Sequence, residues 1–230
     1  MITPDAHASA RAYDRAGFVG AVITLGCALA FQVLSLTHPD VHLQPTDLPL
    51  SAADFLRPLT HEPQAVMVWM GFDFLFVLGY IAMFTGAVRL ARAPVLAAVS
   101  LGAILTAGAL DATENALLAT QAALSSTGAP VDGVPMTALY VIAALKTAAA
   151  MTAAGFLALA LPTTTRAHRA MAAAAAAFVL VNAAGTALPA LGPVEPLPIA
   201  VLTVLLLVTF RARLRATPST PPISPVAPSR

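Results

Sequence analysis

Four ionisable side chains lie inside long apolar segments of this 230-residue sequence, where charged groups are rare. They are Asp73, Asp111, Glu114 and Lys146. Each lies about seven to ten residues from the same predicted side of its segment, or roughly 10–15 Å along a helix. We therefore expect three separate helices to bring these side chains to one level of a membrane, in its outer half.

Helix periodicity indicates which of these side chains face the same way. Asp111, Glu114 and Asn115 follow the i, i+3, i+4 relation and therefore lie on one face of a helix. Asp73 and Tyr80 are seven residues apart, so they share a face of the preceding apolar segment. The two faces together form the candidate site.

Other polar and aromatic side chains reach the same part of the predicted bundle. Asn182 and Thr203 lie at a similar depth, and Gln32 is somewhat shallower. Trp69 lies near the outer boundary and is expected to be an interfacial anchor. Tyr80 is expected in the core, with its hydroxyl bonded to a neighbour. Tyr80 and Asn182 are the secondary site candidates.

The balance of charge suggests what the site does. A charge at the bilayer centre costs about 2.5–3.5 kcal/mol on insertion scales, so these side chains should face inward and pair. Three acids against Lys146 leave an excess of acid, so at least one is expected to be protonated, bound to a cation or reached by water. The sequence predicts a site that binds or moves a small solute, proton or cation. Asp111 and Glu114 would bind, Lys146 would supply the counter-charge, and Asp73 would be a second acid across the cavity.

The same residues are compatible with two other classes of function. One is an intramembrane enzyme that acts on a lipid or isoprenoid, with a carboxyl as general acid. The other is a structural subunit of a membrane complex, in which Lys146 clamps two helices together. The sequence contains no HExxH, GxSxG or P-loop motif, so it does not predict a zinc protease, a serine hydrolase or an ATP-driven pump.

The predicted outer loop, 37–65, contains nitrogen and oxygen side chains of the kinds that bind zinc or copper. Their spacing matches no metal motif. The single cysteine, Cys27, lies in an apolar segment and is expected to be a small buried side chain. We therefore predict no metal site and no cofactor. The loop side chains concerned are His38, Asp40, His42, His61 and Glu62.

The composition indicates which elements position the site. Hydrophobic residues make up 58% of the chain and charged residues only 10%, against about 25% in a typical soluble domain. Alanine is abundant and no ten-residue alternation is visible, so the fold class is an all-α membrane bundle of six transmembrane helices. Most segments reach the ~20 residues that span a bilayer. The predicted helices are 16–36, 66–88, 95–121, 138–161, 170–191 and 196–210.

Basic residues alternate between successive loops. Ten arginines belong to the termini and to the second and fourth loops, whereas the other three loops contain only Arg57. By the positive-inside rule, both termini are expected in the cytoplasm, and the protein in the cell (inner) membrane. The ten are Arg11, Arg15, Arg89, Arg92, Arg166, Arg169, Arg211, Arg213, Arg215 and Arg230.

The remaining expectations concern domains and partners. Residues 1–215 form one transmembrane domain, and 216–230 form a disordered Pro/Ser-rich tail. Ala28-Leu29-Ala30 offers a signal-peptidase site that would leave five helices, but the apolar segment is longer than a typical signal sequence. The lipid bilayer is the expected partner, with an ion or small molecule as ligand. Nucleic acid is not expected, because the net charge is only +1.

Overall fold

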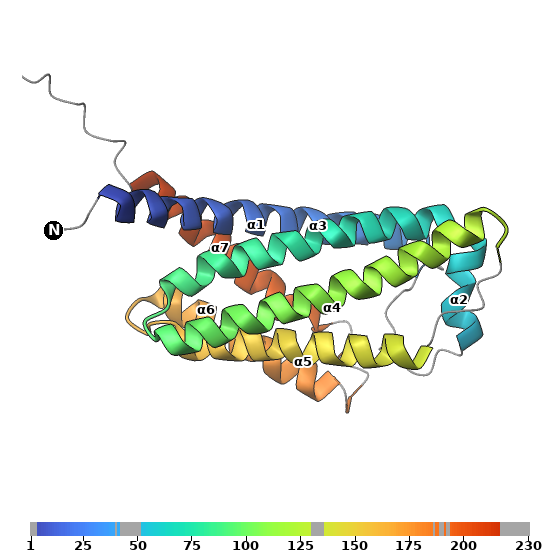
Figure 1. The fold of residues 1–230 in the computed structure, drawn as a ribbon. Helices are drawn as coiled ribbons and strands as arrows, with labels where there is room; N and C mark the ends of the chain where they lie inside the picture. The colour runs from blue at the N-terminus through green and yellow to red at the C-terminus, as the bar shows by residue number, and fades with distance from the viewer. Residues whose placement is uncertain are drawn as a thin grey trace, which may run out of the picture.

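The computed structural model describes residues 4–39, 41, 52–129, 136–185, 187–188, 191 and 194–216, and all regular structure within them is helical. Six of these helices are long and apolar enough to cross a membrane, which confirms the predicted all-α bundle of a multi-pass membrane protein (Figure 1). The elements are α1 (Pro4–Thr37), α2 (Ala52–His61), α3 (Pro63–Ala87), the 3-10 turn η1 (Val88–Leu90), α4 (Pro94–Ser126), α5 (Met136–Ala160), α6 (Arg166–Gly185) and α7 (Pro196–Ala216).

Prolines set several of the helix ends. Pro63, Pro94 and Pro196 are the first residues of α3, α4 and α7. Proline suits this position because its missing N–H would have no partner in the first turn and its φ already fits a helix. At the other end of a helix, α5 stops at Ala160, two residues before Pro162. A proline there removes a backbone donor and disfavours helix in the residue before it.

Some helix bounds differ from the apolar segments of the sequence. Helix α1 begins at Pro4 and α4 extends to Ser126, both beyond the predicted spans. A helix can continue past the hydrocarbon, where its polar residues meet water, and hydropathy does not register that extension. Helix α6 ends at Gly185 rather than at 191. Glycine favours a helix end, although apolar residues follow it here.

The predicted loop 37–65 contains the ten-residue helix α2. Pro58 lies inside α2 and is buried. The predicted disordered tail lies outside the described residues from 217 onward.

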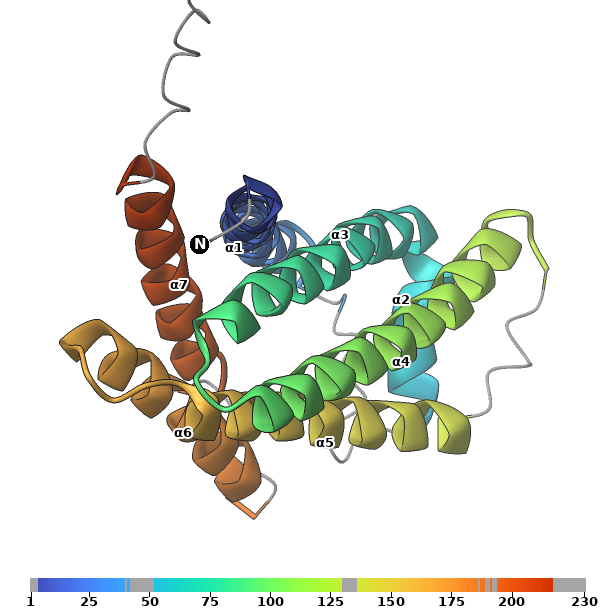
Figure 2. The ribbon, with the colours of Figure 1, turned by 60° about the vertical axis from the view of Figure 1, so that its left-hand side comes forward.

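The six spanning helices form a closed ring. Each of them packs against the next in the chain, and α7 packs against α1 (Figure 2). Short helix α2 lies across one end of this ring, where it contacts α3 and α4. We call this the α2 end. The other end carries the connections between α3 and α4 and between α5 and α6.

We call that second end the arginine end, because the arginines of these connections and of the end of α7 lie there. The Arg213 Nε atom donates to both carboxylate oxygens of Asp14, at 2.9 and 3.1 Å, which joins the end of α7 to the start of α1. The backbone N–H of Arg92 donates to the Ala160 carbonyl at 2.9 Å. The beginning of α1 and the end of α7 therefore lie at one end of the bundle.

Reporter fusions will show which way the bundle is inserted. We predict that fusions after Arg92 and Arg169 report the cytoplasm, because these loops carry the arginine excess. Fusions after Gly128 and Gly192 should report the opposite side. A cytoplasmic signal at Gly192 would mean that α6 does not cross the membrane, whereas reversal of all four signals would invert the predicted orientation.

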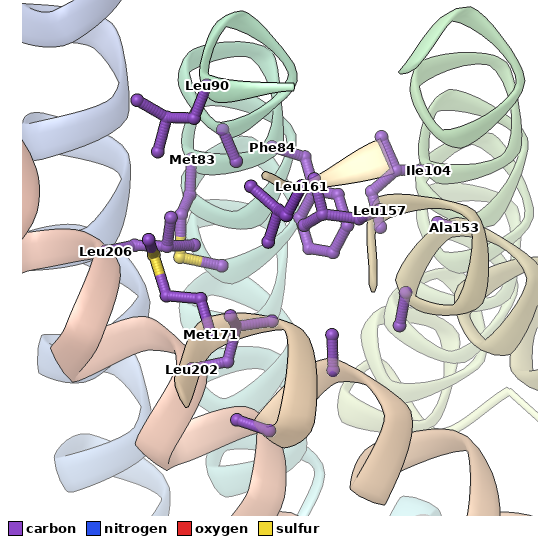
Figure 3. Close-up of a cluster of buried hydrophobic side chains, with 14 of the residues drawn as sticks. Met83, Phe84, Leu90, Ile104, Ala153, Leu157, Leu161, Met171, Leu202 and Leu206 are labelled. Atoms are coloured by element: carbon purple, nitrogen blue, oxygen red, sulfur yellow. The ribbon is translucent and has the colours of Figure 1, made fainter. Parts of the chain in front are cut away.

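The main apolar core fills the half of the bundle nearer the arginine end. All six spanning helices contribute to it, and its small side chains allow the helices to approach closely. Figure 3 shows its larger members meeting between the helices. The labelled residues are Met83, Phe84, Leu90, Ile104, Ala153, Leu157, Leu161, Met171, Leu202 and Leu206.

A second and smaller apolar cluster lies at the α2 end. It joins α2 to α3, α4 and α5, and Leu59 of α2 is fully buried in it. Just beside it, the Nδ1 atom of His38 lies 2.5 Å from the Oε2 atom of Glu62, which connects the end of α1 to the start of α3. The buried members are Val41, Leu59, Val66, Met70, Leu118, Ala122 and Leu139.

Candidate functional site

Lys146 of α5 binds two carboxylates of α4. Its Nζ atom lies 3.0 Å from Asp111 Oδ1 and 2.5 Å from Glu114 Oε2. The acids are deeply buried, with 8% and 3% of their side-chain surfaces exposed, whereas the lysine side chain is 28% exposed. The predicted pairing of Lys146 with an acid of the neighbouring helix is confirmed. Whether these residues bind a ligand stays a prediction.

The geometry of α4 follows from helix periodicity. Asp111, Glu114 and Asn115 are all buried, as expected for three residues on one inward face. Helices α4 and α5 pack together beside them, and the Ser100 hydroxyl donates to the Ala153 carbonyl at 2.7 Å across this interface. Small residues on α5, such as the buried Ala143, allow the close approach that brings Lys146 to both acids.

Helix α3 adds a tyrosine and a third acid. The Tyr80 hydroxyl donates to Asp111 Oδ2 at 3.2 Å, which confirms the expected bond of this hydroxyl to a neighbour. Asp73 is partly buried and lies within electrostatic reach of Asp111 and Lys146. In the described part of the chain, however, Asp73 forms no ion pair.

Asn115 of α4 faces Asp73 of α3 across the interface of the two helices. Only 2% of the residue is exposed, and its Nδ2 atom makes no hydrogen bond of standard geometry to any described residue. The Asp73 carboxyl is the acceptor that faces it. The contact between these two side chains is therefore a hydrogen bond of poor geometry.

Sequence reasoning named Trp69 and Tyr80 but did not identify Phe31 and Phe76, which join them in an aromatic group. The Phe31 ring of α1 stacks on Trp69 with ring centres 5.1 Å apart, and contacts the edge of Phe76 at 5.8 Å. Phe76 in turn meets Tyr80 at 5.5 Å. Trp69 is therefore packed against α1, in addition to any anchoring role. The spacing 69, 73, 76 and 80 puts Phe76 on the face of Asp73, and this signal could have revealed Phe76.

The two apolar clusters enclose the site on all three helices that form it. Along α4, buried Ala107 belongs to the main core and Leu118 to the cluster at the α2 end, with the acids between them. Along α5, Lys146 lies between Leu139 and Ala153 in the same way. The charged group is therefore separated from both ends of the bundle by apolar side chains.

The other candidates lie apart from this group. The Asn182 amide donates to the Phe178 carbonyl and the Thr203 hydroxyl to the Ile199 carbonyl, each within its own helix at 2.8 Å. In the described residues no bond joins Asn182 to the acids or to Lys146. Gln32 is exposed.

The loop side chains that resemble metal ligands do not gather in the part of the chain that the structure describes. His38 pairs with Glu62, His61 is exposed, and Asp40 and His42 lie outside the described residues. No group of three or more His, Cys, Asp or Glu side chains among the described residues could hold a metal ion.

Comparison with known proteins finds no matching family model, no similar curated protein and no similar solved structure.

Proposed function

We propose that this multi-pass membrane protein binds a small cation or a proton at Asp73 and moves it through the bundle. The observation that carries the proposal is the charge of the site. Three carboxyl groups share one ammonium, which leaves a formal charge of −2 when all four are ionised. Uncompensated charge is costly inside a membrane, so the site is most stable when protons or cations supply the missing positive charge.

Asp73 is the acid best suited to exchange its cation. Asp111 and Glu114 already bond to Lys146, and Asp111 also accepts from Tyr80. A charged hydrogen bond of this kind is strong and holds its partners in place. Asp73 has no such ion pair in the described residues, and it is more exposed than the other two acids. A ligand can therefore bind to it without breaking the pair.

The position of the site supports movement of the ligand as well as binding. Apolar clusters lie on both sides of it, so a bound cation is separated from water at each end. Release requires one of these clusters to open. The cluster at the α2 end is the smaller of the two, and it depends on a ten-residue helix rather than on spanning helices alone. We expect this end to open more readily.

A purely structural role explains Lys146 but does not explain Asp73. One lysine with two acids is sufficient to clamp α4 to α5. A third acid without an ion pair adds an electrostatic cost to the folded protein, and the side chain that it contacts among the described residues is the neutral Asn115 amide of α4. Its presence beside the clamp favours a cation site.

Charge movement in reconstituted membranes tests the proposal for any small cation. The full chain is reconstituted on a solid-supported membrane, and transient currents are recorded after jumps in pH, NaCl or choline chloride. We expect the wild type to give a current for at least one of these jumps, and Asp73→Asn to abolish it. The matched control is Asp54→Asn, which makes the same change in α2 and should leave the current unchanged.

Two outcomes contradict the proposal. One is a correctly folded wild type that gives no current for any jump. The other is a folded Asp73→Asn variant whose currents equal those of the wild type. Circular dichroism and gel filtration in detergent establish that each variant is folded before it is reconstituted.

A further inference from the structure

The aromatic residues beside Asp73 indicate which kind of cation the site accepts. We propose that the ligand is an organic ammonium ion, held between the Asp73 carboxylate and the aromatic group formed by Phe31, Trp69, Phe76 and Tyr80. This inference rests on the proposed function, since it assumes that Asp73 binds a cation.

The aromatic group and the carboxylate belong to the same surface of α3. Trp69, Asp73, Phe76 and Tyr80 are separated by four, three and four residues, so the acid lies within a single aromatic stripe. Phe31 of α1 joins Trp69 to Phe76, and Phe76 contacts Tyr80 directly, with ring centres 5.1 to 5.8 Å apart. An ammonium ion paired with Asp73 would lie beside aromatic rings, whose electron-rich faces attract organic cations.

Inorganic cations fit this environment less well. Calcium and magnesium require about six or more oxygen ligands in a close shell. The acids of the site do not gather into a group that could hold a metal ion, although all of them are described. Aromatic surfaces combined with one carboxylate are the means by which proteins recognise ammonium groups.

Asn115 adds a polar group beside the Asp73 carboxyl. Its buried Nδ2 atom faces this carboxyl across the α3–α4 interface and bonds to it outside ordinary hydrogen-bond geometry. A cation that draws Asp73 toward the aromatic group would change this contact, and a hydroxyl group on the ligand can accept from the same N–H.

The single tryptophan of the chain provides a direct test. Because Trp69 belongs to the aromatic group, all tryptophan emission comes from the proposed site. The full-length protein in detergent is titrated with choline chloride, with its neutral isostere 3,3-dimethylbutan-1-ol, and with NaCl at matched ionic strength. We expect a saturable change in emission with choline and none with the neutral alcohol, because only choline carries the charge.

Variants show whether the response depends on the named residues. Asp73→Asn should abolish the choline response, and Phe76→Leu should weaken the apparent affinity by roughly tenfold, since it removes a ring but keeps the apolar volume. The matched control is Phe74→Leu, which makes the same change on the same helix at a side chain that is 38% exposed and on another face. Its choline titration should match that of the wild type.

The outcomes separate this inference from the proposed function. If choline has no saturable effect, while pH or NaCl jumps still give currents that require Asp73, the site takes a proton or inorganic cation and the organic ligand is wrong. If choline binds equally well to Asp73→Asn or Phe76→Leu, or no better than the neutral alcohol, the proposed contacts are wrong. If no cation produces an Asp73-dependent response in either experiment, both proposals fail together.

Discussion

Lys146→Met is expected to lower the free energy of unfolding by about 3 kcal/mol. This is the lower end of the 3–5 kcal/mol range for breaking a buried ion pair, because the lysine keeps 28% of its side chain exposed. The loss leaves Asp111 and Glu114 buried without their common partner. Unfolding by SDS in mixed micelles measures the change. Arg57→Met removes an exposed cation from α2 and should change stability by less than about 0.5 kcal/mol.

A triple variant separates the clamp from a working site. Lys146→Met combined with Asp111→Asn and Glu114→Gln removes all three charges with little change in volume. It should recover most of the stability lost by Lys146→Met alone, because neither Asp111 nor Glu114 is left as a buried charge without its partner. We also expect it to give no cation-dependent current, since the ionisable groups that set the electrostatics of Asp73 are gone. A triple variant that is stable and gives wild-type currents would leave the three residues with a purely structural role.

The sequence was sufficient to predict the bundle and much of the polar group. Long apolar segments must become helices in a membrane because each backbone N–H and C=O group needs a partner within its own segment. Periodicity then placed Asp111, Glu114 and Asn115 on one face, and the shared depth of the charges predicted that Lys146 would pair with Asp111 or Glu114; it binds both. These inferences depend on local geometry and on the cost of isolated charge, and both can be read from one chain.

Contacts that depend on how two helices cross could not be predicted in this way. Phe31 meets Trp69 and Phe76 only because α1 lies close against α3. Hydropathy records that a residue is apolar but not which neighbour it faces. The same limit applies to the end of α6 at Gly185, since the residues that follow it are as apolar as those before.

The close approach of α1 and α3 depends on glycines. A Cβ atom at Gly20 would clash with the backbone nitrogen of Met83 and would lie only 2.5 Å from the backbone oxygen of Gly79. Gly79 is also restricted, because its Cβ would lie 2.8 Å from the Thr24 hydroxyl. Small residues at such crossings let the backbones of membrane helices pack directly against each other. This crossing also brings Phe31 to Trp69 and therefore shapes the aromatic side of the site.

Gly20→Ala is accordingly expected to destabilise the protein by about 2–3 kcal/mol, because the added methyl group meets backbone atoms that cannot move aside without separating the helices. Gly26→Ala is the matched control on the same helix, where a Cβ would meet no atom within 4 Å. It should be neutral or stabilising by up to about 1 kcal/mol, since alanine is the better helix former. Unfolding by SDS measures both variants, and Trp69 emission should shift in Gly20→Ala alone, as Phe31 moves away from the indole ring. Equal stability and emission in the two variants would show that this crossing does not hold α1 in place.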